Sequence, residues 1–168
     1  MAEQEPSLAT GSATCIKLAL PYLRATDRLA EAIAPLLQKG DVVELQGQVG
    51  VGKTTFVRGL IRSLGGTGAV PSPTFNLLYV YELGAITIWH FDLFRVGSLA
   101  DTYELGIEDA LDTGVSLIEW PEIMAPITPK DRLEIKFSYA GLESRHVTIH
   151  GHGSWTQRLP HLESLVDV

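Results

Sequence analysis

Residues 47–54 read Gly-Gln-Val-Gly-Val-Gly-Lys-Thr, which fits the phosphate-binding pattern Gly-x-x-x-x-Gly-Lys-Thr. Glycines in this pattern let the backbone turn tightly and point successive N–H groups at an anionic phosphate. Lys53 can reach the β- and γ-phosphates, and the Thr54 hydroxyl is the expected Mg²⁺ ligand. A strand-like run at 42–45 precedes the loop and a helical pattern follows it, so the positive end of that helix faces the phosphates. The stretch therefore predicts an α/β domain that binds a nucleoside triphosphate.

Outward from this loop, the pattern alternates between strands and helices. Predicted strands cover 42–45, Leu77–Glu82, Ala85–Leu93, Val115–Ile118, and an antiparallel hairpin of Leu133–Tyr139 with Arg145–Ile149. One predicted helix begins at Thr26 as its N-cap, is shortened by Pro35 and ends at Gly40. Further helices are predicted to begin at Thr54, at Ser98, which forms a capping box with Asp101, and near Glu108–Leu111. The pattern favours a single P-loop domain with a central, mostly parallel sheet, antiparallel edge strands and helices on both faces.

The two ends of the chain differ from its middle in composition. Residues 1–14 are small and polar and are predicted to be a disordered lead. The P-loop domain is expected over 15–150. The remaining tail, 151–168, can form one amphipathic helix between Trp155 and Val166.

Composition limits the classes of partner. The formal net charge is −7, with 13 Lys and Arg against 20 Asp and Glu, so the chain lacks the basic surplus of most nucleic-acid-binding proteins. If RNA is involved, we expect contact through partner proteins, although a basic patch formed in three dimensions is an alternative. No apolar run approaches the roughly 18 residues of a membrane span, and a single cysteine, Cys15, suits a reducing compartment. A cytoplasmic protein without membrane contact is expected.

Two carboxylates stand where predicted strands end. Asp92 ends the run 86–92 and Glu119 ends the run 115–119. A P-loop enzyme needs acidic groups to hold Mg²⁺ and to orient attacking water, and these stand at the carboxyl ends of strands near the loop. Either residue can instead be a solvated carboxylate, and the pattern does not say which one contacts the metal.

Four polar residues near these acids have more than one interpretation each. His90 lies on the same strand face as Asp92 and is either a hydrogen-bonded structural residue or a catalytic one. Arg95 can pair with Asp92, bind a phosphate or form a surface ion pair. Ser72 and Thr74 belong to a Pro-rich segment that either senses a γ-phosphate or merely connects two elements.

The order of four motifs resembles one family. The motifs are Gly47–Thr55, Ser72-Pro73-Thr74-Phe75, His90-Phe91-Asp92-Leu93-Phe94-Arg95 and Ile118-Glu119-Trp120-Pro121-Glu122. In this order they are similar to the TsaE (YjeE) family of bacterial P-loop ATPases, over about Thr26 to Arg145. Phe94 stands where members usually have Tyr, Gln48 replaces an acidic residue, and Val51 replaces Ala.

The resemblance implies a role and a set of residues. The role is that of an Mg²⁺-dependent ATPase acting with TsaB and TsaD in threonylcarbamoyl modification of adenosine 37 in tRNA, with tRNA contacted only through the complex. It implies Mg²⁺ ligands Thr54 and Glu119, catalytic residues Lys53, Asp92 and Glu119, and an ATP site of Thr26, Gly50, Val51, Gly52, Lys53, Thr54 and Thr55. A nucleotide-facing role for Arg145 is a further expectation.

Two other functions fit the phosphate loop. One is a small-molecule kinase, although no Arg-rich lid segment is visible in the sequence. The other is an ATP-dependent switch in which binding, without hydrolysis, orders the 72–75 loop against a partner. Hydrolysis is expected to be slow without partners, because a partner can complete the stabilisation of transition-state charge.

Overall fold

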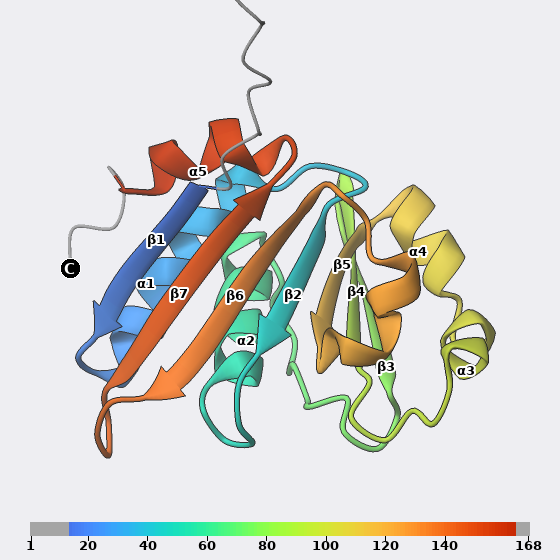
Figure 1. The fold of residues 1–168 in the computed structure, drawn as a ribbon, viewed down its shortest axis with the longest axis horizontal. Helices are drawn as coiled ribbons and strands as arrows, with labels where there is room; N and C mark the ends of the chain where they lie inside the picture. Colours follow the sequence, from blue (N-terminus) through green and yellow to red (C-terminus); the bar gives the residue numbers. More distant parts are fainter. Residues whose placement is uncertain (1–13, 164–168) are drawn as a thin grey trace, which may run out of the picture.

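A seven-stranded sheet runs through residues 14–163, the part of the chain that the computed structural model describes (Figure 1). The strands are β1 (Thr14–Leu20), β2 (Val42–Gln46), β3 (Leu78–Leu83), β4 (Ile86–Asp92), β5 (Val115–Glu119), β6 (Arg132–Tyr139) and β7 (Arg145–His152). The helices are α1 (Leu23–Ile33), α2 (Lys53–Ser63), α3 (Leu99–Glu104), α4 (Ile107–Thr113) and α5 (Trp155–Glu163), with 3₁₀ turns η1 (Ala34–Leu36) and η2 (Pro121–Ile127).

The sheet is parallel in its centre and antiparallel at both edges. Its order is β1-β7-β6-β2-β5-β4-β3. The P-loop strand β2 pairs in parallel with β6 and β5, and β5 pairs in parallel with β4. Antiparallel pairing joins β1 to β7, β7 to β6, and β3 to β4. The predicted single α/β domain with a mostly parallel centre and antiparallel edges is confirmed.

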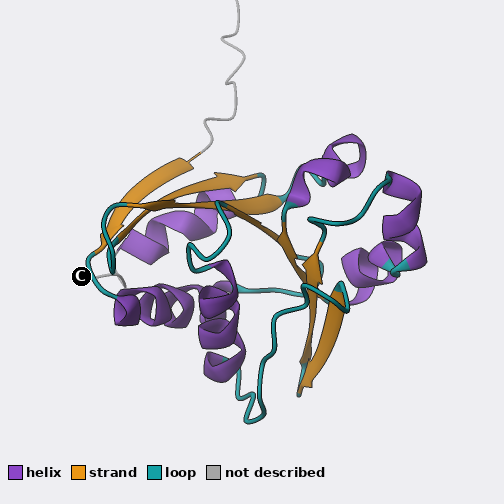
Figure 2. Ribbon diagram, turned by 90° about the horizontal axis from the view of Figure 1, so that it is seen from below, coloured by secondary structure: helices purple, strands orange, loops and turns teal. Residues whose placement is uncertain are grey.

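Helices cover both faces of this sheet (Figure 2). On one face, α1, α2 and α5 pack over a core that includes Leu29, Phe56 and Trp155, all fully buried. On the other, α4 and η2 pack over a smaller core around Phe91, Ile107 and Met124. Each large apolar side chain that becomes fully buried contributes roughly 1.5–3 kcal/mol, so these two cores stabilise the layers.

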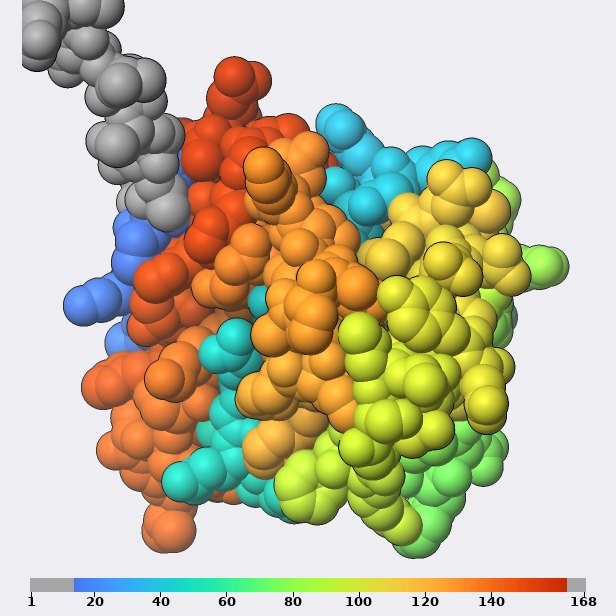
Figure 3. All heavy atoms as spheres, turned by 45° about the vertical axis from the view of Figure 1, so that its right-hand side comes forward, coloured from blue at the N-terminus to red at the C-terminus, as the bar shows by residue number. Residues whose placement is uncertain are grey.

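The second face is covered only in part. Segments α3 and α4 occupy its β4–β5 side, drawn in yellow-green and yellow on the right of Figure 3. No described helix lies in front of β1, β7 and β6 in Figure 1. Alternate residues of these strands, such as Leu133, Ile135 and Ile149, enter the first core, so their neighbours in sequence point to the uncovered face.

The first helix corrects one prediction. It begins at Leu23 with Tyr22 as its N-cap, so the prediction that Thr26 is the cap is wrong. Thr26 lies inside the helix and is buried, because packing of the helix against the core decides where it starts. Pro35 does shorten the helix, since the α-helical turns end at Ile33 and the chain continues as η1.

Other local predictions have mixed outcomes. Ser98 and Asp101 form the predicted capping box at the start of α3. Strand β1 was not predicted, although Ile16, Leu18 and Leu20 alternate along it. The turn η2 was not predicted either. Residues 1–13 of the predicted lead and 164–168 of the predicted tail lie outside the described residues.

Among the described helices, none combines the length and apolar character needed to cross a bilayer.

Candidate functional site

Strand β2 delivers the chain into the phosphate-binding loop. Gly47 follows the strand with a positive φ of 137°, and a Cβ there would lie 2.6 Å from the carbonyl oxygen of Phe137. Any side chain at this position would therefore collide with the backbone of β6. Gly52, with φ 121°, is the N-cap of α2. The N–H groups of the first helical turn have no partner within the helix and are therefore free to donate to a phosphate at the loop.

Lys53 is the first residue of α2 and is 5% exposed. Its Nζ donates hydrogen bonds to the carbonyl oxygens of Gly47 and Gln48, and it lies 4.1 Å from the centre of the Trp120 ring. Burial lowers the pKa of the ammonium group, and the carboxylates of Glu119, Asp92 and Glu122 oppose this effect. The ammonium group therefore lies within the loop, where it can bind an anion.

Glu119 ends β5, the strand directly beside β2. Its Oε1 accepts a hydrogen bond of 2.9 Å from the Thr54 hydroxyl. The same oxygen lies 2.8 Å from Nε2 of His90, so Nε2 carries the proton. His90 is fully buried, and its Nδ1 has no hydrogen-bond partner among the described residues. Both predicted Mg²⁺ ligands are thus in contact, and His90 orients one of them.

Asp92 ends β4 and lies directly opposite Glu119 in the parallel pair. Its carboxylate accepts a hydrogen bond of 3.0 Å from the Phe94 amide and one of 3.4 Å from the Thr74 hydroxyl. The Thr74 hydroxyl is also 2.6 Å from that of Ser72. The Pro-rich segment therefore reaches the second carboxylate instead of passing over the surface.

These groups line one cavity of about 470 Å³, a size typical of small-molecule sites. Its walls are Val49, Gly50, Gly52, Lys53, Thr54, Thr55, Arg58, Ser72, Thr74, Asp92, Phe94, Arg95, Glu119 and Trp120. Of the predicted site residues, Thr26 and Val51 do not line it. Both are buried, Thr26 within α1 and Val51 against Gly47. Contact of Thr26 with a nucleotide base stays a prediction.

The donor set fits a magnesium nucleotide. The loop supplies backbone N–H groups and one ammonium group, which suit phosphate oxygens. Thr54, Glu119 and Asp92, which all line the cavity, supply oxygen donors, which Mg²⁺ prefers. Because both carboxylates stand at the carboxyl ends of neighbouring parallel strands, the sheet itself fixes their separation.

The loop is held from outside by two residues. Arg145, at the start of β7, is buried and donates from Nε to the Val51 carbonyl at 2.9 Å. Its guanidinium lies 4.5 Å from the centre of the Tyr139 ring, and the Tyr139 hydroxyl donates to the Val49 carbonyl at 3.0 Å. Arg145 does not line the cavity; it binds the backbone of the phosphate loop.

The sequence did not indicate the aromatic wall of the cavity. Trp120, with a positive φ of 57°, packs against Phe94 with ring centres 4.7 Å apart and planes tilted by 45°, and it covers Lys53. Arg95 lies over the ring of Phe75 at 4.8 Å and faces the cavity. A Trp directly after the acid at the end of β5 was the available signal for this wall.

Comparison with known proteins gives a consistent result. The family model "Threonylcarbamoyl adenosine biosynthesis protein TsaE" matches residues 20–147. The chain is 38% identical over 125 residues to the protein named tRNA threonylcarbamoyladenosine biosynthesis protein TsaE from Treponema pallidum, covering 74% of this chain and 92% of that one. The protein of the same name from Bacillus subtilis is 34% identical over 130 residues, covering 77% and 81%.

A solved structure has the same fold. The crystal structure of YdiB from Bacillus subtilis superposes with a TM-score of 0.76 at 27% identity, covering 92% of this chain and 98% of that one. With a family model that matches most of its length and relatives above 30% identity, the chain belongs to the TsaE family.

Proposed function

We propose that this chain is an Mg²⁺-dependent ATPase. It would bind and hydrolyse ATP in the cytoplasm in support of the TsaB–TsaD complex, during threonylcarbamoyl modification of adenosine 37 in tRNA. The observation that carries the proposal is the hydrogen bond between Thr54 and Glu119, beside Lys53 at the mouth of the phosphate loop. A residue pair of this kind holds Mg²⁺ in P-loop enzymes.

Residues in the cavity wall and directly behind it have chemical tasks under this proposal. The ammonium group of Lys53 exchanges its two backbone carbonyls for phosphate oxygens when nucleotide binds. His90 donates to Glu119 and keeps that carboxylate directed at the Thr54 hydroxyl. Asp92 has the position to accept a hydrogen bond from the attacking water. Bound Mg²⁺ would neutralise charge on the phosphate oxygens.

The role in a complex rests on the family and on charge. The matching family is described by threonylcarbamoyl adenosine biosynthesis, and the relatives are named for tRNA threonylcarbamoyladenosine biosynthesis. The chain itself has a net charge of −7, which disfavours direct binding to a polyanion. Contact with tRNA through TsaB and TsaD is the arrangement that reconciles these two facts.

Release of phosphate from ATP, measured with and without purified TsaB and TsaD, tests the proposal. We expect slow hydrolysis by the isolated protein, acceleration by the partners, and loss of hydrolysis in Lys53→Ala and Glu119→Gln. Lys136→Ala and Glu82→Gln are matched controls, because both residues are exposed and lie on strands outside the cavity. Both controls should hydrolyse ATP as the wild type does.

Other outcomes would point to the other two functions. Transfer of the γ-phosphate to a metabolite instead of water identifies a kinase. Full support of the partner reaction by Asp92→Ala and Glu119→Ala, in proteins that still bind ATP, identifies a switch. Hydrolysis that the partners leave unchanged would contradict the proposed complex.

A further inference from the structure

A row of side chains that can each act as a metal ligand crosses the uncovered face of the sheet, away from the nucleotide cavity. In the strand registers, Glu134 of β6 lies opposite His150 of β7, and His150 lies opposite Cys15 of β1. His152 follows His150 by two residues and so projects from the same face. None of these residues lines the nucleotide cavity.

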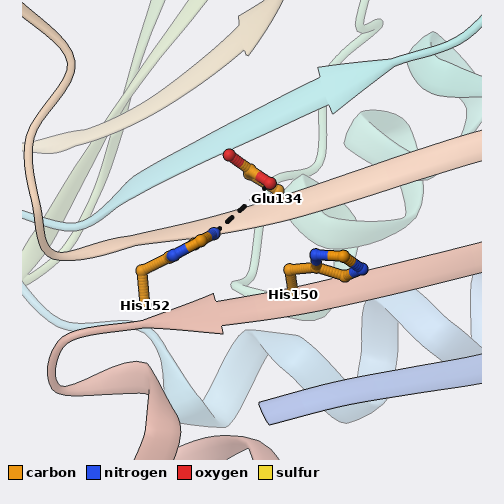
Figure 4. A group of neighbouring side chains, drawn as sticks. All are labelled: Glu134, His150 and His152. Carbon is orange, nitrogen blue, oxygen red and sulfur yellow. Dashed lines mark ion pairs between the residues drawn. The ribbon is translucent and has the colours of Figure 1, made fainter. Parts of the chain in front are cut away.

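Three of these side chains converge. One ligand atom each from Glu134, His150 and His152 lies within 4.8 Å of the other two. Figure 4 shows the three side chains on one side of β6 and β7, with the carboxylate of Glu134 facing the ring of His152. Nε2 of His152 is 3.3 Å from Oε2 of Glu134, and their side chains are only 25% and 24% exposed.

The two oxygens of Glu134 have different partners. Arg132 donates from Nε and from a terminal nitrogen to Oε1, at 3.1 and 2.7 Å. Oε2, the oxygen that faces His152, accepts nothing from Arg132. The guanidinium therefore fixes the carboxylate and leaves one oxygen directed at the two imidazoles.

The charge around this group favours a cation. The buried carboxylate of Glu44 lies opposite Glu134 in the β2–β6 register and 3.5 Å from Nε of Arg132. Two carboxylates thus share one guanidinium. When both histidines are neutral, the local charge is −1, and a divalent ion would reverse it.

Cys15 stands next to this group, outside the 4.8 Å that encloses its three members. It is exposed and stands directly across from His150, where side chains on one face have Cβ atoms about 4.5–5.5 Å apart. Thiolate, imidazole and carboxylate together are the ligands of zinc-type sites.

We propose that Glu134, His150 and His152 bind a zinc-like divalent cation, with Cys15 as the fourth ligand. Metal–ligand bonds of about 2.0–2.3 Å in a tetrahedron place ligand atoms roughly 3.3–3.8 Å apart. The His152–Glu134 separation of 3.3 Å already has this value. The other ligand atoms of the three residues, at most 4.8 Å apart, and the Cys15 thiol would move closer by side-chain rotation when the ion binds. The ion would join strands β1, β7 and β6 on the face that no described helix covers.

Isothermal titration calorimetry with Zn²⁺ tests the proposal, on full-length protein without a polyhistidine tag, in reducing buffer with excess Mg²⁺. One ion per chain is expected, with affinity reduced by about 100-fold or more in His150→Ala and His152→Ala. The matched control is His146→Ala, because His146 is exposed on the same face of β7 but outside the group. Glu119→Gln controls for Zn²⁺ at the nucleotide cavity; both controls should bind as the wild type does.

Two results would overturn the proposal. One is a wild-type chain that binds no Zn²⁺ under these conditions, and the other is binding that persists undiminished in His150→Ala and His152→Ala. Substituting Co²⁺ for Zn²⁺ tests Cys15, because a thiolate ligand adds a charge-transfer absorption that Cys15→Ser should abolish. A Co²⁺ complex of the wild type without this absorption removes Cys15 from the site. Phosphate release from ATP by His150→Ala should match the wild type, so this test and that of the ATPase can fail separately.

Discussion

His90 and Glu119 form a buried pair in which Nε2 and Oε1 lie 2.8 Å apart. They stand on neighbouring parallel strands, 29 residues apart in the chain. Since Thr54 donates to the same carboxylate oxygen, the histidine determines how the carboxylate meets the phosphate loop. Partners of this kind fix the orientation and basicity of metal-binding carboxylates.

Replacing His90 with Phe should therefore weaken the binding of Mg²⁺ without altering any residue of the cavity wall. We expect the Mg²⁺ concentration for half-maximal ATP hydrolysis to rise by about 10–100-fold. His90→Gln retains an amide donor and should recover part of the loss. An unchanged Mg²⁺ dependence in His90→Phe, measured by phosphate release, would show that the pair serves packing alone.

Arg145 binds the phosphate loop from outside, so Arg145→Met should affect both folding and nucleotide use. Loss of a charge-assisted bond to the buried Val51 carbonyl should lower the free energy of unfolding by about 1.5–3 kcal/mol. Displacement of the loop should lower kcat/KM for ATP by at least about 10-fold. Urea unfolding and phosphate release measure the two effects. Arg24→Met, at an exposed position of α1, is the control and should change neither quantity.

The largely buried ion pair of Arg158 and Asp41 attaches α5 to the segment before β2. Both terminal nitrogens of Arg158 lie 2.7 Å from Asp41 oxygens, and the two side chains are 13% and 9% exposed. Arg158→Ala leaves a buried carboxylate without its partner and should cost about 3–5 kcal/mol of unfolding free energy. Arg62→Ala breaks the exposed pair with Asp27, whose side chains are 60% and 35% exposed, and should cost less than about 1 kcal/mol. Equal costs in urea unfolding would contradict this assignment.

Glu44 predicts a pH dependence of stability. Burial raises the pKa of its carboxyl group above 4.5, and Glu134 adds to this effect, whereas Arg132 and Thr128 oppose it. The folded state therefore holds this proton more tightly than the unfolded state does. The resulting stability is fully present below pH 4.5 and is lost as the pH rises through the raised pKa.

Glu44→Gln imitates the protonated form and should remove this loss. The difference in free energy of unfolding between Glu44→Gln and the wild type should be larger, in favour of the variant, at pH 7 than at pH 4. Urea unfolding at both pH values, with a chelator present, measures the difference. The exposed Glu82→Gln should show no such change between the two pH values.

Much of the fold was predictable because its signals are local. The phosphate loop, the strand before it and the Ser98–Asp101 capping box depend on residues a few positions apart. The start of α1 was not predictable from the sequence, because Tyr22 makes no side-chain capping bond and tertiary packing decides where the helix begins. Strand β1 was overlooked although its apolar residues alternate.

The candidate site was predictable in its members but not in its connections. The motif order indicated Lys53, Thr54, Asp92 and Glu119, which line one cavity. The contact of His90 with Glu119 depends on the pairing of β4 with β5. The pattern of residues within each strand does not reveal which strands pair, so this contact could not be predicted. The hydrogen bond from Arg145 to Val51 joins residues 94 positions apart, so no short sequence pattern predicts it.

The pairing of β1 with β7 affects how the chain can fold during its synthesis. The two strands lie at opposite ends of the described sequence, in full register from Thr14 with Gly151 to Leu20 with Arg145. Roughly 130 residues separate them, so at about 5–20 residues per second β1 waits on the order of ten seconds for its partner to be translated. Strand β2 likewise precedes both of its neighbours. The sheet is therefore completed only after the ribosome has made β7, and a nascent chain stalled before that point keeps an unpaired apolar strand that a chaperone could bind.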